Sequence, residues 1–176
     1  SAASDVYKRQ SPDGKILLVA NEGEPDDSYT VDPEGSVCII DLSAGVPNIN
    51  RSHLTFLGFD NAPMLIEGSL QKPGVSWAQD LEPEYIAINE SSTLAAVVCQ
   101  ESNVFVFIDL QTKSIISYKG LGFKDHSISG NGFDASNKDN QINIQTWNVK
   151  GVYQPDDISS FTHNGQTFWS FSYTHL

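Results

Sequence analysis

The sequence has few of the basic residues that nucleic-acid-binding proteins need. It contains 10 lysines and arginines against 22 aspartates and glutamates, for a formal net charge of −12. Because contacts to phosphate require clustered lysine and arginine, this balance argues against a nucleic-acid partner. The acidity favours solubility and cation binding, and a solvated acidic surface is an equally good interpretation.

Several familiar motifs are also missing. The chain has no G-x-S-x-G nucleophile motif, and Gly130-Asn131-Gly132 lacks the flanking strand and helix of a phosphate-binding loop. His53, His126 and His163 do not have the spacing of zinc ligands. No apolar run approaches the roughly 20 residues of a membrane-spanning helix. We therefore expect no membrane insertion by this segment and find little support for nucleophilic catalysis.

Cysteine and charge are both scarce. Cys38 and Cys99, the two cysteines, lie in or beside apolar segments of different repeats, which favours independent buried thiols over a disulfide. Charged residues make up only 18% of the chain, whereas asparagine, serine, threonine, glycine and β-forming residues are abundant. This composition predicts an all-β protein of the secreted type.

The two ends resemble translated sequencing adapters. Residues 1–10 are SAASDVYKRQ and residues 172–176 are SYTHL. If Asp5 to Gln10 are encoded GAT GTG TAT AAG AGA CAG, one frame of the reverse complement contains TCT TAT ACA CAT, which encodes Ser172 to His175. We therefore interpret 1–10 and 172–176 as adapter scars and 11–171 as the genuine fragment. The lack of a signal peptide then carries no information.

Residues Glu82 to Leu110 contain the pattern that the chain repeats. Polar turns separate three strand-like segments, Tyr85–Ile88, Leu94–Cys99 and Val104–Leu110. This is the pattern of a β-meander, and a repeated meander is typical of a β-propeller blade. The fold class that we predict is all-β, a partial β-propeller of two to three blades with long irregular loop insertions.

Two further copies align with this pattern. Ser11 aligns with Asn89 and Asp41 with Asp109, so that the first copy has extra residues in the segment 25–34. A third copy begins at Tyr153 and continues through the Asn164-Gly165 turn. Between the copies, the segment 43–79 shows no sustained helical or strand period. We expect an extended connection there, with or without a short helix. The segment 119–148 predicts an ordered loop with aromatic anchors.

Four stretches taken together resemble one known family. They are LLVANEGEPDDSYTVDPEGSVCIIDL (17–42), AQDLEPEYIAI (78–88), LGFKDHSISGNGFDASNKDNQINI (121–144) and VKGVYQPDDISSF (149–161). These stretches resemble the choice-of-anchor I domain, a family of bacterial cell-surface β-propellers. The resemblance implies an extracellular protein tethered to the envelope by a separate signal. Some relatives carry phosphatase-like or phytase-like labels, which this fragment does not decide.

The best candidate site is an acid-Pro-acid element that occurs twice. It reads Glu82-Pro83-Glu84 in one copy and Gln154-Pro155-Asp156 in the next. Proline at the start of a strand sacrifices no ladder hydrogen bond, and the acid after it can then face a shared axis. Such carboxylates suit Ca²⁺, the cofactor that we predict, although they can equally cap the turns of a repeated corner.

Two other clusters supply candidate ligands. The first is an acidic loop, in which like charges repel unless they are solvated or bound to a cation; its candidate metal ligands are Glu22, Glu24, Asp26 and Asp27, followed by Asp32 and Glu34. The second cluster contains Asp125, His126 and Asp134. It lacks the EF-hand pattern, so any ion site there must draw on several loops. Asp125 and His126 can be a general acid/base pair or ordinary loop residues.

Two functions follow from these candidates. The first is a non-catalytic surface platform for binding or adhesion, supported by Ca²⁺, with an unidentified surface ligand and the remaining propeller blades as partners. The alternative is a metal-dependent phosphoester hydrolase acting on a phosphorylated small molecule. There, Ca²⁺ at Glu84 and Asp156 would polarise the phosphate, and His126 would assist proton transfer. Lys124 would help to neutralise the charge of the phosphate.

Overall fold

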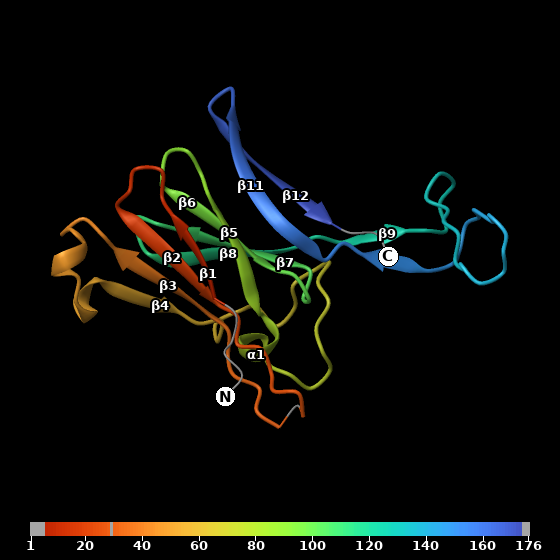
Figure 1. Cartoon of the computed structure of the whole chain (residues 1–176), viewed down its shortest axis with the longest axis horizontal. Coiled ribbons are helices and arrows are strands. Elements are labelled where there is room, and N and C mark those ends of the chain that lie inside the picture. The colour runs from red at the N-terminus through yellow and green to blue at the C-terminus, as the bar shows by residue number, and fades with distance from the viewer. Residues whose placement is uncertain (1–5, 29, 174–176) are drawn as a thin grey trace.

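The chain folds into antiparallel β-sheets with very little helix. The structure, a computed structural model, describes residues 6–28 and 30–173. Two four-stranded sheets and two hairpins lie beside one another in Figure 1. The first sheet contains β1 (Val6–Gln10), β2 (Ile16–Asn21), β3 (Ser36–Asp41) and β4 (Leu54–Leu57). The second contains β5 (Pro83–Ile88), β6 (Leu94–Cys99), β7 (Val104–Asp109) and β8 (Ser114–Gly120).

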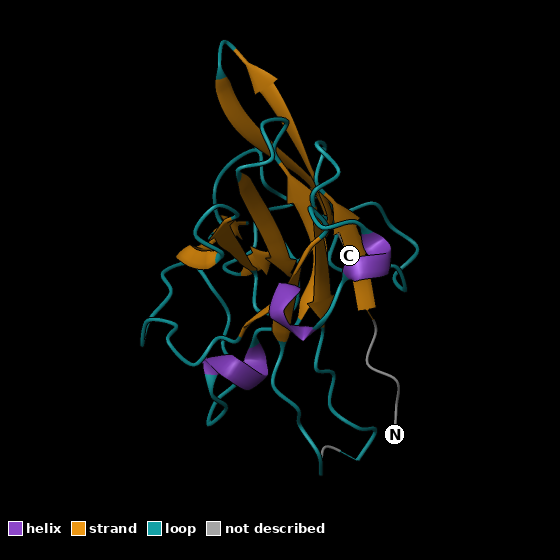
Figure 2. Ribbon diagram, turned by 90° about the vertical axis from the view of Figure 1, so that its left-hand side faces the viewer, coloured by secondary structure: helices purple, strands orange, loops and turns teal. Residues whose placement is uncertain are grey.

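The two hairpins follow the second sheet. They are formed by β9 (Phe123–Asp125) with β10 (Lys150–Val152), and by β11 (Pro155–His163) with β12 (Gln166–Tyr173). The helical turns are short and lie in connections (Figure 2), and comprise α1 (Trp77–Asp80) and two 3-10 turns, Val46–Asn48 and Arg51–His53. The prediction of an all-β chain of repeated meanders is confirmed.

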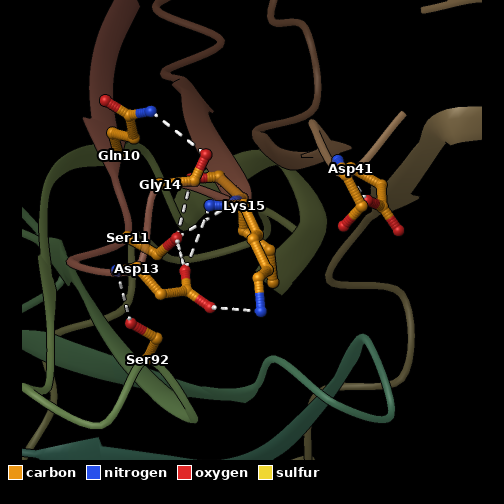
Figure 3. Close-up of polar contacts among 9 residues, drawn as sticks. Gln10, Ser11, Asp13, Gly14, Lys15, Asp41 and Ser92 are labelled. Atoms are coloured by element: carbon orange, nitrogen blue, oxygen red, sulfur yellow. Dashed lines mark hydrogen bonds and ion pairs between the residues drawn. The ribbon is translucent and has the colours of Figure 1, made fainter. Parts of the chain in front are cut away.

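Equivalent turns open the two four-stranded sheets. In the first, the N–H of Ser11 donates to Ile16 O at 2.8 Å, and Gly14 adopts a φ of 74° (Figure 3). In the second, the N–H of Asn89 donates to Leu94 O at 2.9 Å, and Ser92 takes the same left-handed conformation with a φ of 58°. The predicted alignment of Ser11 with Asn89 is therefore confirmed.

Two apolar layers hold the sheets together. The larger lies between the first and second sheets, where Leu18, Ile39, Val97 and Val106 have no exposed surface. The smaller lies between the second sheet and the β11–β12 hairpin, with Ile158 at its centre. Because strand side chains alternate between faces, the second sheet is buried on both sides, which explains its nearly continuous apolar strands.

The segment 43–79 is more structured than its sequence predicts. It contains β4, which completes the first sheet, and then packs against the end of the second. A Cβ on Gly120 would lie 2.3 Å from Glu67 O, so the two backbones meet where only glycine fits. The short helix that we considered is present, because α1 begins within this segment, but the predicted excursion also contains β4, whose four residues are too few to show a period.

Residues 6–10 contribute a strand, although we excluded 1–10 from our sequence analysis of the fold. β1 pairs along its whole length with β2, from Val6 opposite Asn21 to Gln10 opposite Leu17. Backbone ladders are largely independent of sequence, so pairing does not show where the residues come from. The interpretation of 1–10 and 172–176 as adapter scars stays a prediction, and residues 1–5 and 174–176 lie outside the described residues.

The sheets form no closed ring within the described residues, so the propeller remains a prediction. Cys38 and Cys99 are both buried free thiols, as predicted. Burial raises the pKa of both thiols above its ordinary value, and Cys99 has no exposed surface.

Candidate functional site

The first strand of each repeat lies beside the first strand of the next. β5 packs against β1 on one side and β11 on the other (Figure 1). The rings of Tyr7 and Tyr85 lie 4.6 Å apart near the start of β1 and β5, and Asp13 N–H donates to Ser92 Oγ at 3.1 Å beyond their ends. Contacts at both ends show that β1 and β5 run in the same direction.

The repeated proline element has the same local structure in β5 and β11. Pro83 and Pro155 each begin a strand and are buried. The register shifts between Pro83 and Tyr85 in β5 and between Pro155 and Asp157 in β11, so Glu84 and Asp156 are the extra residues at equivalent bulges. A bulge re-aims a side chain, and these two bulges bring the side chains of Glu84 and Asp156 into the same acidic region.

Glu84 lies in the centre of this acidic region. Burial and, to a smaller extent, the neighbouring charges of Glu22, Glu101, Glu82 and Asp156 together raise its pKa to about 7. The structure thus places Glu22, Glu82 and Asp156 near enough to Glu84 for their charges to raise its pKa, and all four are predicted metal ligands. These residues come from three repeats, and the shared axis stays a prediction.

A cleft opens beside Glu84 between the first two sheets. Its volume is about 250 Å³, and its walls are formed by Val6, Tyr7, Glu22, Pro83, Glu84 and Tyr85. Carboxylates and tyrosine rings in one small cleft favour a cationic group over an anionic one.

Glu82 is held differently from Glu84, by a lysine. Its side chain is 4% exposed, and Lys72 Nζ lies 3.1 Å from Glu82 Oε1 and 3.0 Å from Glu101 Oε2. Burial raises the pKa of Glu82 to about 7 even though the hydrogen bond from Lys72 opposes this shift. For Lys72 the pKa is raised, because its hydrogen bonds to Glu101 and Glu82 outweigh the effect of burial. The partly exposed ammonium group of Lys72 thus neutralises Glu82.

A buried polar network adjoins the acidic region and joins Asp80 to Lys72 and Ser102. Asp80, which is 2% exposed, accepts from the backbone N–H of Lys72 at 3.3 Å, and Ser102 Oγ donates to the Asp80 carbonyl. Burial raises the pKa of Asp80. Sequence analysis missed Lys72, Asp80 and Ser102, and of these only Asp80 lies beside the Glu82-Pro83-Glu84 element in sequence.

Asn103 joins three segments at the same end of the sheets. Its side-chain amide donates to Gly68 O at 3.0 Å and Gly122 O at 2.8 Å, and its Oδ1 accepts from Gln154 N–H at 3.3 Å. The residue has no exposed surface and a φ of 57°. Asn103 therefore positions Gln154, which lies two residues before Asp156, relative to the second sheet.

The acidic loop of residues 22–34 divides into separate parts. Asp26 accepts hydrogen bonds from Thr30 N–H at 2.7 Å, Val31 N–H at 3.1 Å and Ser28 Oγ at 2.9 Å. The bond from Val31 and those from Thr30 and Ser28 lower the pKa of Asp26 to about 2. Asp26 thus stabilises its own turn, and Glu24 and Asp27 are exposed. The structure does not bring these three to Glu84.

The third predicted cluster lies on the arm beyond β9, which extends away from the sheets in Figure 1. His126 Nδ1 lies 2.7 Å from Asn131 O, and its ring packs on Phe133 at 4.7 Å. Asp125 accepts from Ser127 N–H at 2.9 Å, and Asp134 accepts from Asn143 N–H at 3.0 Å. These contacts make the 126–149 segment an ordered loop. They do not bring Asp125, His126 or Asp134 to the acidic region.

Among residues 6–28 and 30–173, no group of three or more acidic, histidine or cysteine side chains has the arrangement of a metal site. The nearest cation to Glu82 is Lys72. Calcium therefore stays a prediction. The hydrolase alternative gains no support. His126 lies apart from the acidic region, and Lys72, the lysine within that region, is already paired with Glu82 and Glu101.

The fold and the acidic region together define an all-β protein built from repeated antiparallel sheets whose first strands meet at an acidic junction. The chain belongs to the choice-of-anchor I domain family, whose model matches residues 9–171. The resemblance in sequence is thereby confirmed, and membership suggests a bacterial cell-surface domain. No curated protein matches the chain. None of the helices in the described residues is both long and apolar enough to span a membrane.

Proposed function

We propose that the chain is part of a secreted, envelope-anchored β-propeller that serves as a surface platform for binding or adhesion. The observation that carries this proposal is the alignment of β1, β5 and β11, with Glu22, Glu84 and Asp156 drawn into one region. In a propeller, equivalent positions of successive blades converge on the axis, where ligands gather. The equivalent bulges at Glu84 and Asp156 support this placement.

We extend the proposal to Ca²⁺, with Glu22, Glu84 and Asp156 as protein ligands. Mutual repulsion among carboxylates contributes to the raised pKa of Glu84, and a divalent cation would relieve that repulsion. Ca²⁺ takes about 6–8 oxygen ligands, so backbone carbonyls, water or further blades would have to supply the rest. Glu82 is excluded from this set because Lys72 holds its carboxylate.

Calorimetric titration with Ca²⁺ tests the ion. We expect heat with the wild-type chain and none with the double variant Glu84→Gln, Asp156→Asn. The matched control is Glu24→Gln with Asp27→Asn, which removes the same charge from exposed loop positions and should bind as wild type does. An absence of heat at millimolar Ca²⁺ with the wild-type chain would remove the calcium proposal.

Hydrolysis of p-nitrophenyl phosphate separates a binding platform from an enzyme. We expect equal background rates for the wild-type chain and the Glu84→Gln, Asp156→Asn variant, with or without Ca²⁺. A calcium-dependent rate that is lost in the variant would instead establish the hydrolase.

A further inference from the structure

β1 is attached to the molecule mainly through its backbone. All five of its residues pair with β2, yet only Tyr7 is partly buried, and Val6, Lys8, Arg9 and Gln10 are exposed. Tyr7 packs on the main core and against the tilted ring of Tyr85. When a strand is held by backbone hydrogen bonds and one aromatic side chain, its other positions can accept many different residues.

β2 does not depend on β1 for its own anchorage. Its Leu18 and Ala20 have no exposed surface, and its other edge pairs along its whole length with β3. The edge of β2 that faces β1 is therefore a preformed row of backbone donors and acceptors on a buried strand. If residues 1–10 derive from an adapter, this edge already holds a foreign sequence.

We propose that this edge of β2 is a strand-acceptor site that binds an extended peptide carrying one inward-facing aromatic side chain, in the place that β1 occupies. Main-chain hydrogen bonds supply the binding energy, and the pocket for the alternate side chain supplies the specificity. Binding through the backbone ladder and the aromatic side chain needs no Ca²⁺, so this site can fail or succeed separately from the proposed function, although Ca²⁺ at Glu22 and Glu84 would compete with a basic residue of the peptide.

The surroundings of Val6 and Tyr7 specify the chemistry of the peptide further. Both residues line the cleft that also contains Glu22 and Glu84. A lysine in the position of Val6 would place its ammonium group among these carboxylates. The acceptor site should therefore prefer peptides with a basic residue directly before the aromatic one, and that preference should weaken as salt is added.

The test uses the full chain with Tyr7→Ala, which weakens β1, and fluorescein-labelled peptides VYKRQS, VAKRQS and KYKRQS. Fluorescence anisotropy should show VYKRQS binding at least about tenfold more tightly to Tyr7→Ala than to wild type, since β1 competes in the wild-type chain. VAKRQS should bind at least about tenfold more weakly than VYKRQS. KYKRQS should bind most tightly. Lys8→Ala, which changes an exposed β1 side chain, is the matched control and should behave as wild type does.

A second measurement does not depend on how the variant folds. In wild type, hydrogen exchange of the β1 amides should be faster than that of the β3 amides, because β1 can open alone. Equal exchange in β1 and β3 would overturn the proposal. Failure of VYKRQS to bind a folded Tyr7→Ala chain, or equal binding of VAKRQS, would also overturn it.

Discussion

The backbone N–H of Asp13 donates to Ser92 Oγ at 3.1 Å, which joins the opening turns of the first two sheets (Figure 3). The two residues are far apart in sequence, but their turns have the same hydrogen-bonding pattern. Tyr7 and Tyr85 make the corresponding contact at the other end of β1 and β5. Because β1 and β5 are joined at both ends, Glu22, which directly follows β2, lies near Glu84 on β5. This proximity has measurable consequences.

The first consequence is a dependence of stability on pH. The pKa of Glu84 is about 7 in the folded chain against an ordinary value of 4.5, so the folded state binds more protons than the unfolded state between these values. The free energy of unfolding therefore falls as pH rises through this interval. Glu84→Gln removes the titrating group, and at pH 8 it should be more stable than wild type by about 1–2 kcal/mol.

Urea denaturation at pH 4.5 and pH 8 measures this difference, which should shrink to a few tenths of a kcal/mol at the lower pH, because Glu84 is then protonated in the folded state and about half protonated in the unfolded state. The exposed Glu90 provides the control Glu90→Gln, for which we expect no change at either pH. An equal effect of Glu84→Gln at both pH values would show that the side chain acts by packing and not by charge.

Sequence analysis predicted the parts of the site that repeat. Ser11 and Asn89 occupy equivalent turns, and Glu84 and Asp156 occupy equivalent bulges, because a turn or a strand start needs particular residues at a fixed spacing. Lys72 left no such signal. Its pairing with Glu82 depends on how the irregular 43–79 segment docks, and no local rule gives the path of such a segment.

The same limit explains why Asn103 was assigned only to a turn. Its conformation is local, but its three partners, at Gly68, Gly122 and Gln154, come from distant loops. The acidic loop shows the converse. Sequence analysis treated its carboxylates as one cluster. In the structure Asp26 instead accepts hydrogen bonds from backbone N–H groups of its own turn, because the short side chain of an aspartate reaches such nearby groups readily.

Removal of the Asn103 side chain should destabilise the chain strongly. Asn103→Ala removes three hydrogen bonds to partly buried backbone groups and places alanine at a φ of 57°, for a total cost of about 3–4 kcal/mol. Asn103→Gly should cost about 1 kcal/mol less, because glycine accepts that conformation. Urea denaturation gives both values.

Asn164 is the control for backbone strain. It has a φ of 50° but is exposed, so Asn164→Ala should cost only about 1 kcal/mol. A similar cost for alanine at positions 103 and 164 would contradict the joining role of Asn103.

Lys72 is expected to stabilise the chain by neutralising Glu82. Lys72→Met removes the partner of a buried carboxylate and should cost about 1–2 kcal/mol at pH 8, a modest value since the lysine side chain is 44% exposed. The pKa of Glu82 should rise above about 7 in this variant, so the loss should largely disappear at pH 5, where Glu82 is protonated.

A double-mutant cycle isolates the pair. Lys72→Met should cost less in a Glu82→Gln background than in wild type, since no buried charge is then left unpaired. If the cost is the same in both backgrounds, Lys72 acts through its other contacts, such as the ion pair with Glu101.

The last prediction concerns β12, whose outer edge has no strand partner among the described residues. Unpaired edges promote association between chains, and a lysine on the edge strand opposes it. Ser170 lies on β12 directly opposite Ser159 on β11, and both are exposed. Ser170→Lys and Ser159→Lys thus add the same charge to the same cross-strand pair, but β11 also contacts β5 and β6, so the edge of β12 is the more open of the two. We expect light scattering of concentrated samples to fall several-fold more for Ser170→Lys, whereas equal reductions would attribute association to net charge and not to the strand edge.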